Sequence, residues 1–201
     1  MKKLVSICMA LLLLSVFPLS ASAGHLSHTV VKGDTMWKIA SQYQTGTSEV
    51  ISANPQISNP NLIYPGQVLT IPQENSSTLA FEAEVIRLVN EQRAKNGLKA
   101  LTANWELSRV ARYKSQDMAV NRYFSHTSPT YGTPFQMIKA FGLTYRTAGE
   151  NIAYGQRTPQ TVVNAWMNSS GHRANILSAS YTQIGVGYVP NGHYWTQMFI
   201  G

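Results

Sequence analysis

The segment IGVGYVPNGHYWTQMFI, residues 184–200, predicts two antiparallel strands near the end of the chain. Large apolar residues alternate with Gly185 and Gly187, so one face of the first strand is bare. The turn sequence Pro-Asn-Gly at residues 190–192 follows, and Asn-Gly turns join the strands of hairpins. Residues 194–200 form the second strand. We therefore expect a β-hairpin that belongs to an antiparallel sheet.

Four helices are predicted before this hairpin from apolar spacing and capping residues. The first covers residues 79–96, and the second begins at the cap Asn104 and continues to residue 121. The third, residues 133–142, and the fourth, from Thr158, both open with Thr-Pro, a cap followed by proline at the first helical position. Helices first and paired strands late are typical of an α+β fold in which helices cover an antiparallel sheet.

Residues 28–72 are expected to form a separate small module. A turn-rich stretch of Asn, Pro and Gly, residues 59–66, precedes its last strand. Asp34 is expected to cap the first helix of the module. The predicted order is strand, helix, helix, strand, at residues 29–31, 35–43, 48–53 and 68–71.

The first 23 residues match a secretory signal peptide. Lys2 and Lys3 precede an apolar run, residues 4–17, and Ala-Ser-Ala at residues 21–23 fits a cleavage site. The alternative, an uncleaved membrane anchor, is disfavoured because the apolar run is short for a membrane span. We expect cleavage after Ala23 and no transmembrane segment in the product. The predicted organisation is then signal peptide 1–23, module 28–72, polar linker 73–78 and second domain 79–201.

The only cysteine, Cys8, lies in this leader, so the product is expected to have no disulfide and no thiol nucleophile. The chain carries 16 Lys and Arg against 9 Asp and Glu, a net charge of +7, and loss of Lys2 and Lys3 would leave 14 against 9, or +5. A modest positive charge suits an anionic surface such as a cell wall or membrane. No nucleic-acid partner is expected, because the basic residues form no run and alternate with acids on a solvated helical face. These residues are Arg87, Arg93, Arg109 and Arg112.

The small module resembles a LysM domain. The resemblance rests on HTVVKGDTMWKIASQY at residues 28–43, on Asn54-Pro55 and on IYPGQVLTIP at residues 63–72. It implies binding of N-acetylglucosamine-containing glycans, which for a bacterial protein means peptidoglycan. A shallow groove of backbone groups and apolar side chains matches the amide, methyl group and ring face of such a sugar. The groove residues that the resemblance implies are Gly33, Asp34, Thr35 and Met36 on one side and Asn61, Leu62, Ile63 and Tyr64 on the other. Alternatively, the two aliphatic residues of the second set belong to the core, and the acid of the first is only a cap.

The second domain resembles a bacterial CAP domain, also called the SCP-like extracellular domain. The segments that carry this resemblance are LVNEQR (88–93), FSH (124–126), GENIA (149–153), WMNSSGHRANIL (166–177), IGVG (184–187) and YWTQ (194–197). The resemblance implies an α–β–α sandwich with a central cleft. The expected fold class is therefore α+β, with a small βααβ LysM module followed by an α–β–α sandwich CAP domain.

Eukaryotic members of the CAP family line the cleft with two His and two Glu. Two of these four positions match here, at His126 and Glu150, while Ser169 occupies the position of the second Glu. His193 lies one step from the position of the second His, and one step along a strand reverses the face. His172, just after the fourth helix, is therefore the preferred substitute. Two imidazoles and a carboxylate suit zinc or another divalent metal, with the candidate ligands His126, Glu150 and His172.

Structural roles are the alternatives for these residues. Glu150 would then accept backbone N–H bonds as a cap, and His172 would be a partly buried hydrogen-bonding side chain. His126 follows an aromatic residue in a loop, where functional sites concentrate. His193 is expected at the surface of the hairpin turn.

Three functions are open. The first is a secreted protein of the cell wall or spore surface, in which LysM binds peptidoglycan and the CAP domain is a binding or structural module. The second is a cell-wall or peptide hydrolase with Glu150 as general acid or base, assisted by His126 or His172. The sequence has no GxSxG or HExxH motif, and glycoside hydrolysis usually needs two carboxylates. The third is lipid binding in the CAP cleft, as in some relatives, which no residue here supports. We favour the first, non-enzymatic function, with the CAP ligand and the oligomeric state open.

Overall fold

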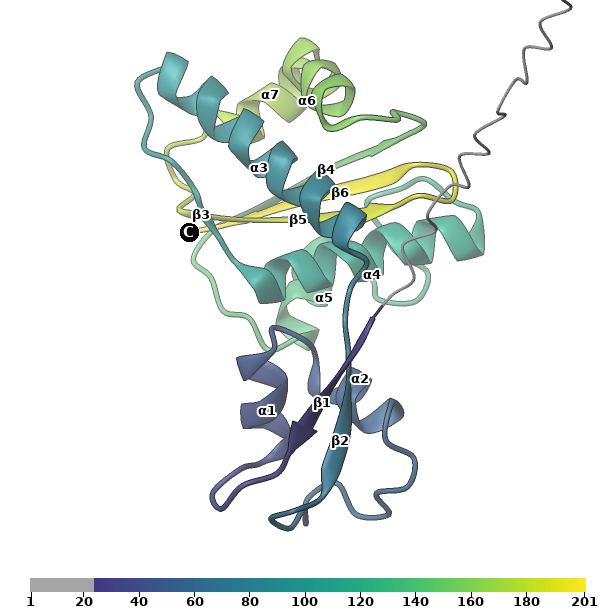
Figure 1. Ribbon diagram of the computed structural model, residues 1–201. Helices are drawn as coiled ribbons and strands as arrows, with labels where there is room; N and C mark the ends of the chain where they lie inside the picture. Colours follow the sequence, from purple (N-terminus) through teal and green to yellow (C-terminus); the bar gives the residue numbers. More distant parts are fainter. Residues whose placement is uncertain (1–23) are drawn as a thin grey trace, which may run out of the picture.

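The computed structural model describes residues 24–201, so the expected signal peptide and Cys8 lie outside the described residues. The LysM module has the predicted order strand, helix, helix, strand (Figure 1). Its two strands pair antiparallel, from His25 opposite Pro72 to Thr29 opposite Val68. The elements are β1 (His25–Thr29), α1 (Met36–Gln42), α2 (Thr47–Ser52) and β2 (Val68–Pro72).

Two details of the predicted LysM module are wrong. The first strand lies at residues 25–29 rather than 29–31, because the chain already turns at Val31, whose carbonyl accepts a hydrogen bond from Asp34 N at 3.1 Å. The cap of α1 is Thr35, whose hydroxyl accepts from Lys38 N at 3.1 Å. The Asp34 carboxylate instead accepts from Val31 N and from His28 Nε2, both at 2.9 Å. Asp34 therefore fixes the turn before the helix.

The second domain is built on a four-stranded sheet with the strand order β3-β5-β6-β4. The predicted hairpin is confirmed as its antiparallel centre, β5 and β6. Two strands were not predicted: β4, which pairs antiparallel with β6 along seven residues, and the two-residue β3, which pairs parallel with β5. The bounds are β3 (Thr102–Ala103), β4 (Ala148–Tyr154), β5 (Gln183–Val189) and β6 (Tyr194–Ile200).

Helices cover both faces of this sheet, which confirms the α–β–α sandwich (Figure 1). One core, around Trp166, Trp195 and Phe199, lies under α3, α6 and α7, and the other, around Leu107 and Met198, lies under α4 and α5. The first helix begins inside the expected linker, because the Asn75 side chain caps it. The helices are α3 (Ser76–Lys95), α4 (Trp105–Asn121), α5 (Pro134–Ala140), α6 (Pro159–Asn168) and α7 (Ser170–Ile176).

The bare face of β5 lies directly against α4. A Cβ atom added at Gly187 would come within 2.1 Å of the Arg112 backbone nitrogen, and one at Gly185 within 2.3 Å of the Leu107 carbonyl carbon. Both atoms belong to the helix backbone, which cannot move aside as a flexible side chain can. The glycines therefore determine how closely α4 approaches the sheet.

The arginines expected on a solvated face differ widely in their surroundings. Arg87 is exposed and pairs with Glu84 and Glu91, as predicted. Arg93 is buried instead, and its guanidinium donates to the carbonyls of residues 99, 176 and 178. The prediction was wrong for this residue because the carbonyls that it satisfies come from distant segments.

The other two arginines bind acids across element boundaries. Arg112 on α4 binds the buried Glu82 of α3 at 2.9 Å, and burial raises the pKa of Glu82 to about 7 against the opposing effect of Arg112. Arg109 on α4 donates to both carboxylate oxygens of Glu49 in the LysM module, at 2.5 and 2.9 Å. The Tyr113 hydroxyl donates to the same carboxylate at 3.0 Å. This ion pair joins the LysM module to the CAP-like domain.

We expect Gly187→Ala to destabilise the protein by about 1–3 kcal/mol, because the added methyl group overpacks the contact with the α4 backbone. The free energy of unfolding from urea titration measures this loss. Gly171→Ala is the matched control, since a Cβ atom there meets nothing within 4 Å. The control lies in a helix and should be neutral or slightly stabilising. Equal stability of both variants would contradict the close approach of α4.

Candidate functional site

The candidate site centres on a hydrogen bond between His126 and Glu150. The Nδ1 atom of His126 donates to Glu150 Oε1 at 2.7 Å. The histidine side chain is 55% exposed, whereas that of Glu150 is 1% exposed. The imidazole therefore forms the accessible end of the pair, and the carboxylate forms its buried end.

The loop that carries His126 is held by two charged residues of α4. Lys114 is buried, and its ammonium group donates to the backbone oxygens of Ser125 at 2.7 Å and His126 at 3.0 Å. Asp117 accepts hydrogen bonds from Ser128 and three other side chains of residues 121–130. Burial opposes ionisation of this acid, but the hydrogen bonds outweigh it and lower the pKa of Asp117. The fixed loop in turn places the imidazole over β4.

Lys114 was not predicted as part of the site. It occupies the helical stripe that otherwise holds Leu107, Val110, Ala111 and Met118, which are all buried. A basic residue on an apolar stripe was the available signal, because a buried ammonium needs several acceptors. Burial lowers the pKa of Lys114, and the nearby charges of Glu150 and Asp117 oppose this effect.

Glu150 lies on β4, the edge strand of the sheet, rather than at a helix cap. Side chains alternate along a strand, so Glu150 points to the α4 layer and Asn151 to the α7 layer. Asn151 donates to the His172 carbonyl at 3.1 Å, and Asn175 donates to the Glu150 carbonyl at 3.1 Å. The amides thus pin α7 to the strand beside the candidate site.

One oxygen of the candidate site has no partner among the described residues. Glu150 Oε2 is buried and forms no hydrogen bond in residues 24–201. Buried polar atoms are almost always hydrogen-bonded, so an unpaired carboxylate oxygen beside an accessible imidazole is a typical mark of a functional site. This oxygen, together with the imidazole, offers an acceptor and a titratable nitrogen to a polar ligand.

His172 lies near the pair without joining it. Partial burial lowers the pKa of His172, and the charge of His126 lowers it further. Within residues 24–201, however, no three His, Cys, Asp or Glu side chains form a group that could hold a metal ion. The proposed ligand set of His126, Glu150 and His172 therefore lacks geometric support, and metal analysis of the protein against His126→Ala is its direct test.

His193 takes no part in the pair. It adopts a left-handed backbone conformation in the hairpin turn, with φ of 53°. Its Nδ1 atom is 2.7 Å from the hydroxyl of Tyr188, which packs on Phe81 of α3. The ring is therefore held on the α3 side of the sheet, opposite to Glu150.

Exposed aromatic rings border the candidate site. The ring of Phe124, two residues before His126, lies 4.8 Å from that of Tyr154 at the end of β4. Tyr154 in turn stacks on Tyr194 at 5.9 Å. Both Phe124 and Tyr154 are largely exposed. These three rings, the aromatic rim, give the site an apolar edge beside its polar centre.

The expected glycan groove of the LysM module lies at the end of that module away from the second domain (Figure 1). The two loops that form it are adjacent, since Val30 and residues 66–67 exchange backbone hydrogen bonds of 2.8 and 2.9 Å. Leu62 and Tyr64 are 52% and 55% exposed. Met36 is buried and Ile63 packs against the core, so these two contribute little surface. Among the eight expected groove residues, the exposed large apolar side chains are therefore Leu62 and Tyr64.

Comparison with known protein families gives a match for each of the two domains. Residues 86–199 match the Cysteine-rich secretory protein family, CAP, and residues 28–72 match the LysM domain. The first match spans more than half of the chain. The chain belongs to the CAP family. It carries a LysM domain in front of its CAP domain.

Individual relatives match parts of the chain. The "Uncharacterized protein YkwD" of Bacillus subtilis (strain 168) is 60% identical over 126 residues, 63% of this chain and 49% of the relative. An extracellular protein containing a SCP domain from Bacillus anthracis str. Ames has a solved structure that matches with a TM-score of 0.60 and 31% identity, over 68% of this chain and 47% of that chain. SpoIVD-associated factor A of Bacillus subtilis is 49% identical over 47 residues, 23% of this chain and 12% of the relative. The chain thus spans about half or less of these relatives.

The pair predicts a pH dependence. The hydrogen bond to Glu150 raises the pKa of His126, against the opposing effects of partial burial and of Lys114. Since the pKa is raised in the folded state, the contribution of His126 to stability is complete below the pKa of the unfolded chain and declines as pH rises through the folded value. We expect the pKa of His126, measured from its resonance, to lie above the ordinary value for histidine. In Glu150→Gln this pKa should be lower than in the wild type.

An NMR titration of the imidazole carbons measures this shift. In His126→Ala, His172 should titrate at higher pH, because the neighbouring positive charge is gone. An unchanged His126 midpoint in Glu150→Gln would show that the pair does not form in solution.

Proposed function

We propose that this protein is a secreted, cell-wall-associated protein whose LysM domain binds peptidoglycan. The observation that supports this most is the exposed pair Leu62 and Tyr64, on the loop that the LysM resemblance assigns to sugar binding. Their apolar surfaces suit the ring face and acetyl group of N-acetylglucosamine, while the adjacent backbone groups suit its amide. The loops that carry the expected groove residues lie at the end of the LysM domain away from the CAP domain, where a long glycan can approach them (Figure 1).

The expected location outside the cell rests on the leader sequence and on binding to the wall. The leader at residues 1–23 predicts export. By length and hydropathy, every helix described in residues 24–201 falls short of a membrane span. Binding to the wall would then retain the protein outside the cell. The relative SpoIVD-associated factor A, which is similar over 47 residues, supports the spore as one such location.

The CAP domain serves in this proposal as a second binding module. Its His126–Glu150 pair offers a polar centre, and the aromatic rim offers an apolar edge. Such a combination suits a ligand with both polar and apolar faces. Hydrolysis is the second candidate function, supported by the unpaired oxygen of a buried carboxylate beside an accessible imidazole. Among the described residues, no contact supports lipid binding.

We expect the purified protein to co-sediment with peptidoglycan sacculi. Tyr64→Ala should weaken this binding about fivefold or more, because it removes an exposed aromatic anchor. Val120→Ala is the control, since Val120 is also more than half exposed but lies near the end of α4 in the CAP domain. Sedimentation assays at several protein concentrations measure the affinity. A folded protein that does not co-sediment with sacculi would refute the proposal.

The choice between binding and hydrolysis depends on Glu150. We expect the wild type to release no soluble fragments from sacculi, as measured by chromatography of the supernatant. A hydrolase would release them and lose about 10²–10⁴-fold of that activity in Glu150→Gln, which removes the acid or base. His193→Ala is the control, because His193 is held away from the pair. Release that falls in the first variant and persists in the second would establish the enzyme.

A further inference from the structure

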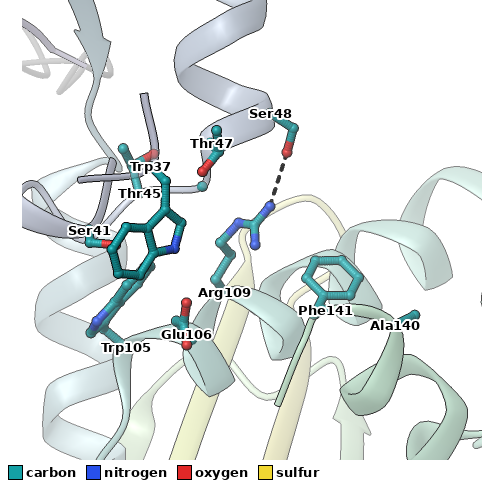
Figure 2. A pocket seen from close by; sticks show the side chains of 11 residues that line it. Trp37, Ser41, Thr45, Thr47, Ser48, Trp105, Glu106, Arg109, Ala140 and Phe141 are labelled. Carbon is teal, nitrogen blue, oxygen red and sulfur yellow. Dashed lines mark hydrogen bonds between the residues drawn. The ribbon is translucent and has the colours of Figure 1, made fainter. Parts of the chain in front are cut away.

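The junction between the LysM and CAP domains contains a cavity of about 370 Å³ (Figure 2). One wall comes from α1 and the connection between α1 and α2, and the other comes from α4 and the end of α5. The volume falls within the range of about 300–1,000 Å³ that is usual for small-molecule sites. The cavity lining includes none of the eight expected groove residues, although Trp37 directly follows one of them, Met36. The loop of Leu62 and Tyr64 lies at the end of the LysM domain away from the CAP domain (Figure 1).

Two tryptophans line this junction cavity. The chain has four tryptophans, and Trp166 and Trp195 are buried in the CAP core at 1% and 0% exposure. Trp37 is 64% exposed, and Trp105 is partly exposed, and both belong to the cavity wall. In Figure 2 both indoles lie on one side of Arg109 and Phe141 lies on the other. The cavity therefore offers flat apolar faces that no described residue covers fully.

The polar lining is mostly neutral. Hydroxyl groups come from the LysM side of the cavity, namely Ser41, Thr45, Thr47 and Ser48. Arg109 is the one basic residue of the lining, and it is already bound to Glu49 and to Ser48 Oγ. Glu106, on the first turn of α4, adds a carboxylate for which the described part of the chain supplies no partner.

These features select a class of ligand. A phosphate or carboxylate ligand needs a free cation, and the lining has none among the described residues because Glu49 occupies the guanidinium. Flat aromatic faces beside hydroxyl and carboxylate groups suit a ring that has C–H groups on its face and hydroxyl groups on its rim. Sugars in the pyranose form have this chemistry. We propose that the junction cavity is a second saccharide site, which binds a hexopyranose unit of the same glycan class as the LysM groove.

The ion pair between the domains holds this site in shape. Arg109 binds Glu49 through two nitrogens and lies over the Phe141 ring at 5.0 Å, and the Tyr113 hydroxyl donates to the same carboxylate. A Cβ atom at Gly46 would lie 2.3 Å from the Arg109 guanidinium carbon, so the LysM backbone is packed directly on the ion pair. The cavity is thus formed before ligand arrives, which lowers the entropic cost of binding.

This inference rests on the proposed glycan-binding function, and the test separates the two. The full protein is titrated with a soluble tetramer of N-acetylglucosamine, and stoichiometry is measured by calorimetry while tryptophan fluorescence is recorded in parallel. We expect two sites, with a fluorescence change, because the two accessible indoles line the cavity while the others are buried.

The variants assign the sites. Trp37→Ala and Trp105→Ala should each weaken one site about tenfold and leave the other unchanged, whereas Tyr64→Ala should weaken only the other site. Trp37→Tyr, which keeps an aromatic face, should retain binding. Trp37 is largely exposed, so its variants are expected to fold, and circular dichroism verifies this.

Three results would overturn the inference. A single site that Tyr64→Ala weakens and both tryptophan variants leave intact would refute the cavity and keep the proposed function. No binding of the tetramer at any site would refute both. Binding of a lysine-containing peptide in place of the sugar, lost in Glu106→Gln, would assign the cavity to a peptide instead.

Discussion

The structure depends on the close approach of α4 to the bare face of β5. Gly185 and Gly187 permit this approach, because a methyl group at either position would strike the helix backbone. The same helix carries the groups that organise the rest of the protein. Its inner face holds Lys114 and Asp117, which fix the loop of His126. Its outer face holds Arg109, which binds the LysM domain. The placement of α4 on the sheet therefore determines the geometry of both the candidate site and the domain junction.

Charged groups inside the CAP domain are stabilised by many partners. Arg93 satisfies three carbonyls, Lys114 has three oxygen acceptors and Asp117 accepts from four side chains. Full satisfaction makes such groups compatible with burial and confers a unique local geometry. Glu150 differs, because one of its oxygens has no partner in the described residues. That contrast distinguishes the fully bonded structural positions from Glu150, which is available to a ligand.

The sequence predicted elements whose signals are local. The hairpin, the helix starts with Thr-Pro and the cap Asn104 all appear as expected, because each depends on neighbouring residues. Strand β4 was missed because the segment AGENIAY has weak strand propensity, and its pairing with β6 is a contact between distant segments. The environments of Arg93 and Arg109 were missed for the same reason. Resemblance identified His126 and Glu150, but no spacing in the sequence could show that they bond while His172 stays apart.

The absence of cysteine from residues 24–201 has a consequence for how the protein is made and used. Members of a family named for cysteine are expected to rely on covalent cross-links, which thiol reductants break. Here the described domains are held together by glycine-mediated packing, saturated buried charges and one ion pair between domains. Their folding thus requires no oxidant and no disulfide isomerase. Thiol reductants and thiol oxidants therefore leave the covalent structure of these two domains unchanged.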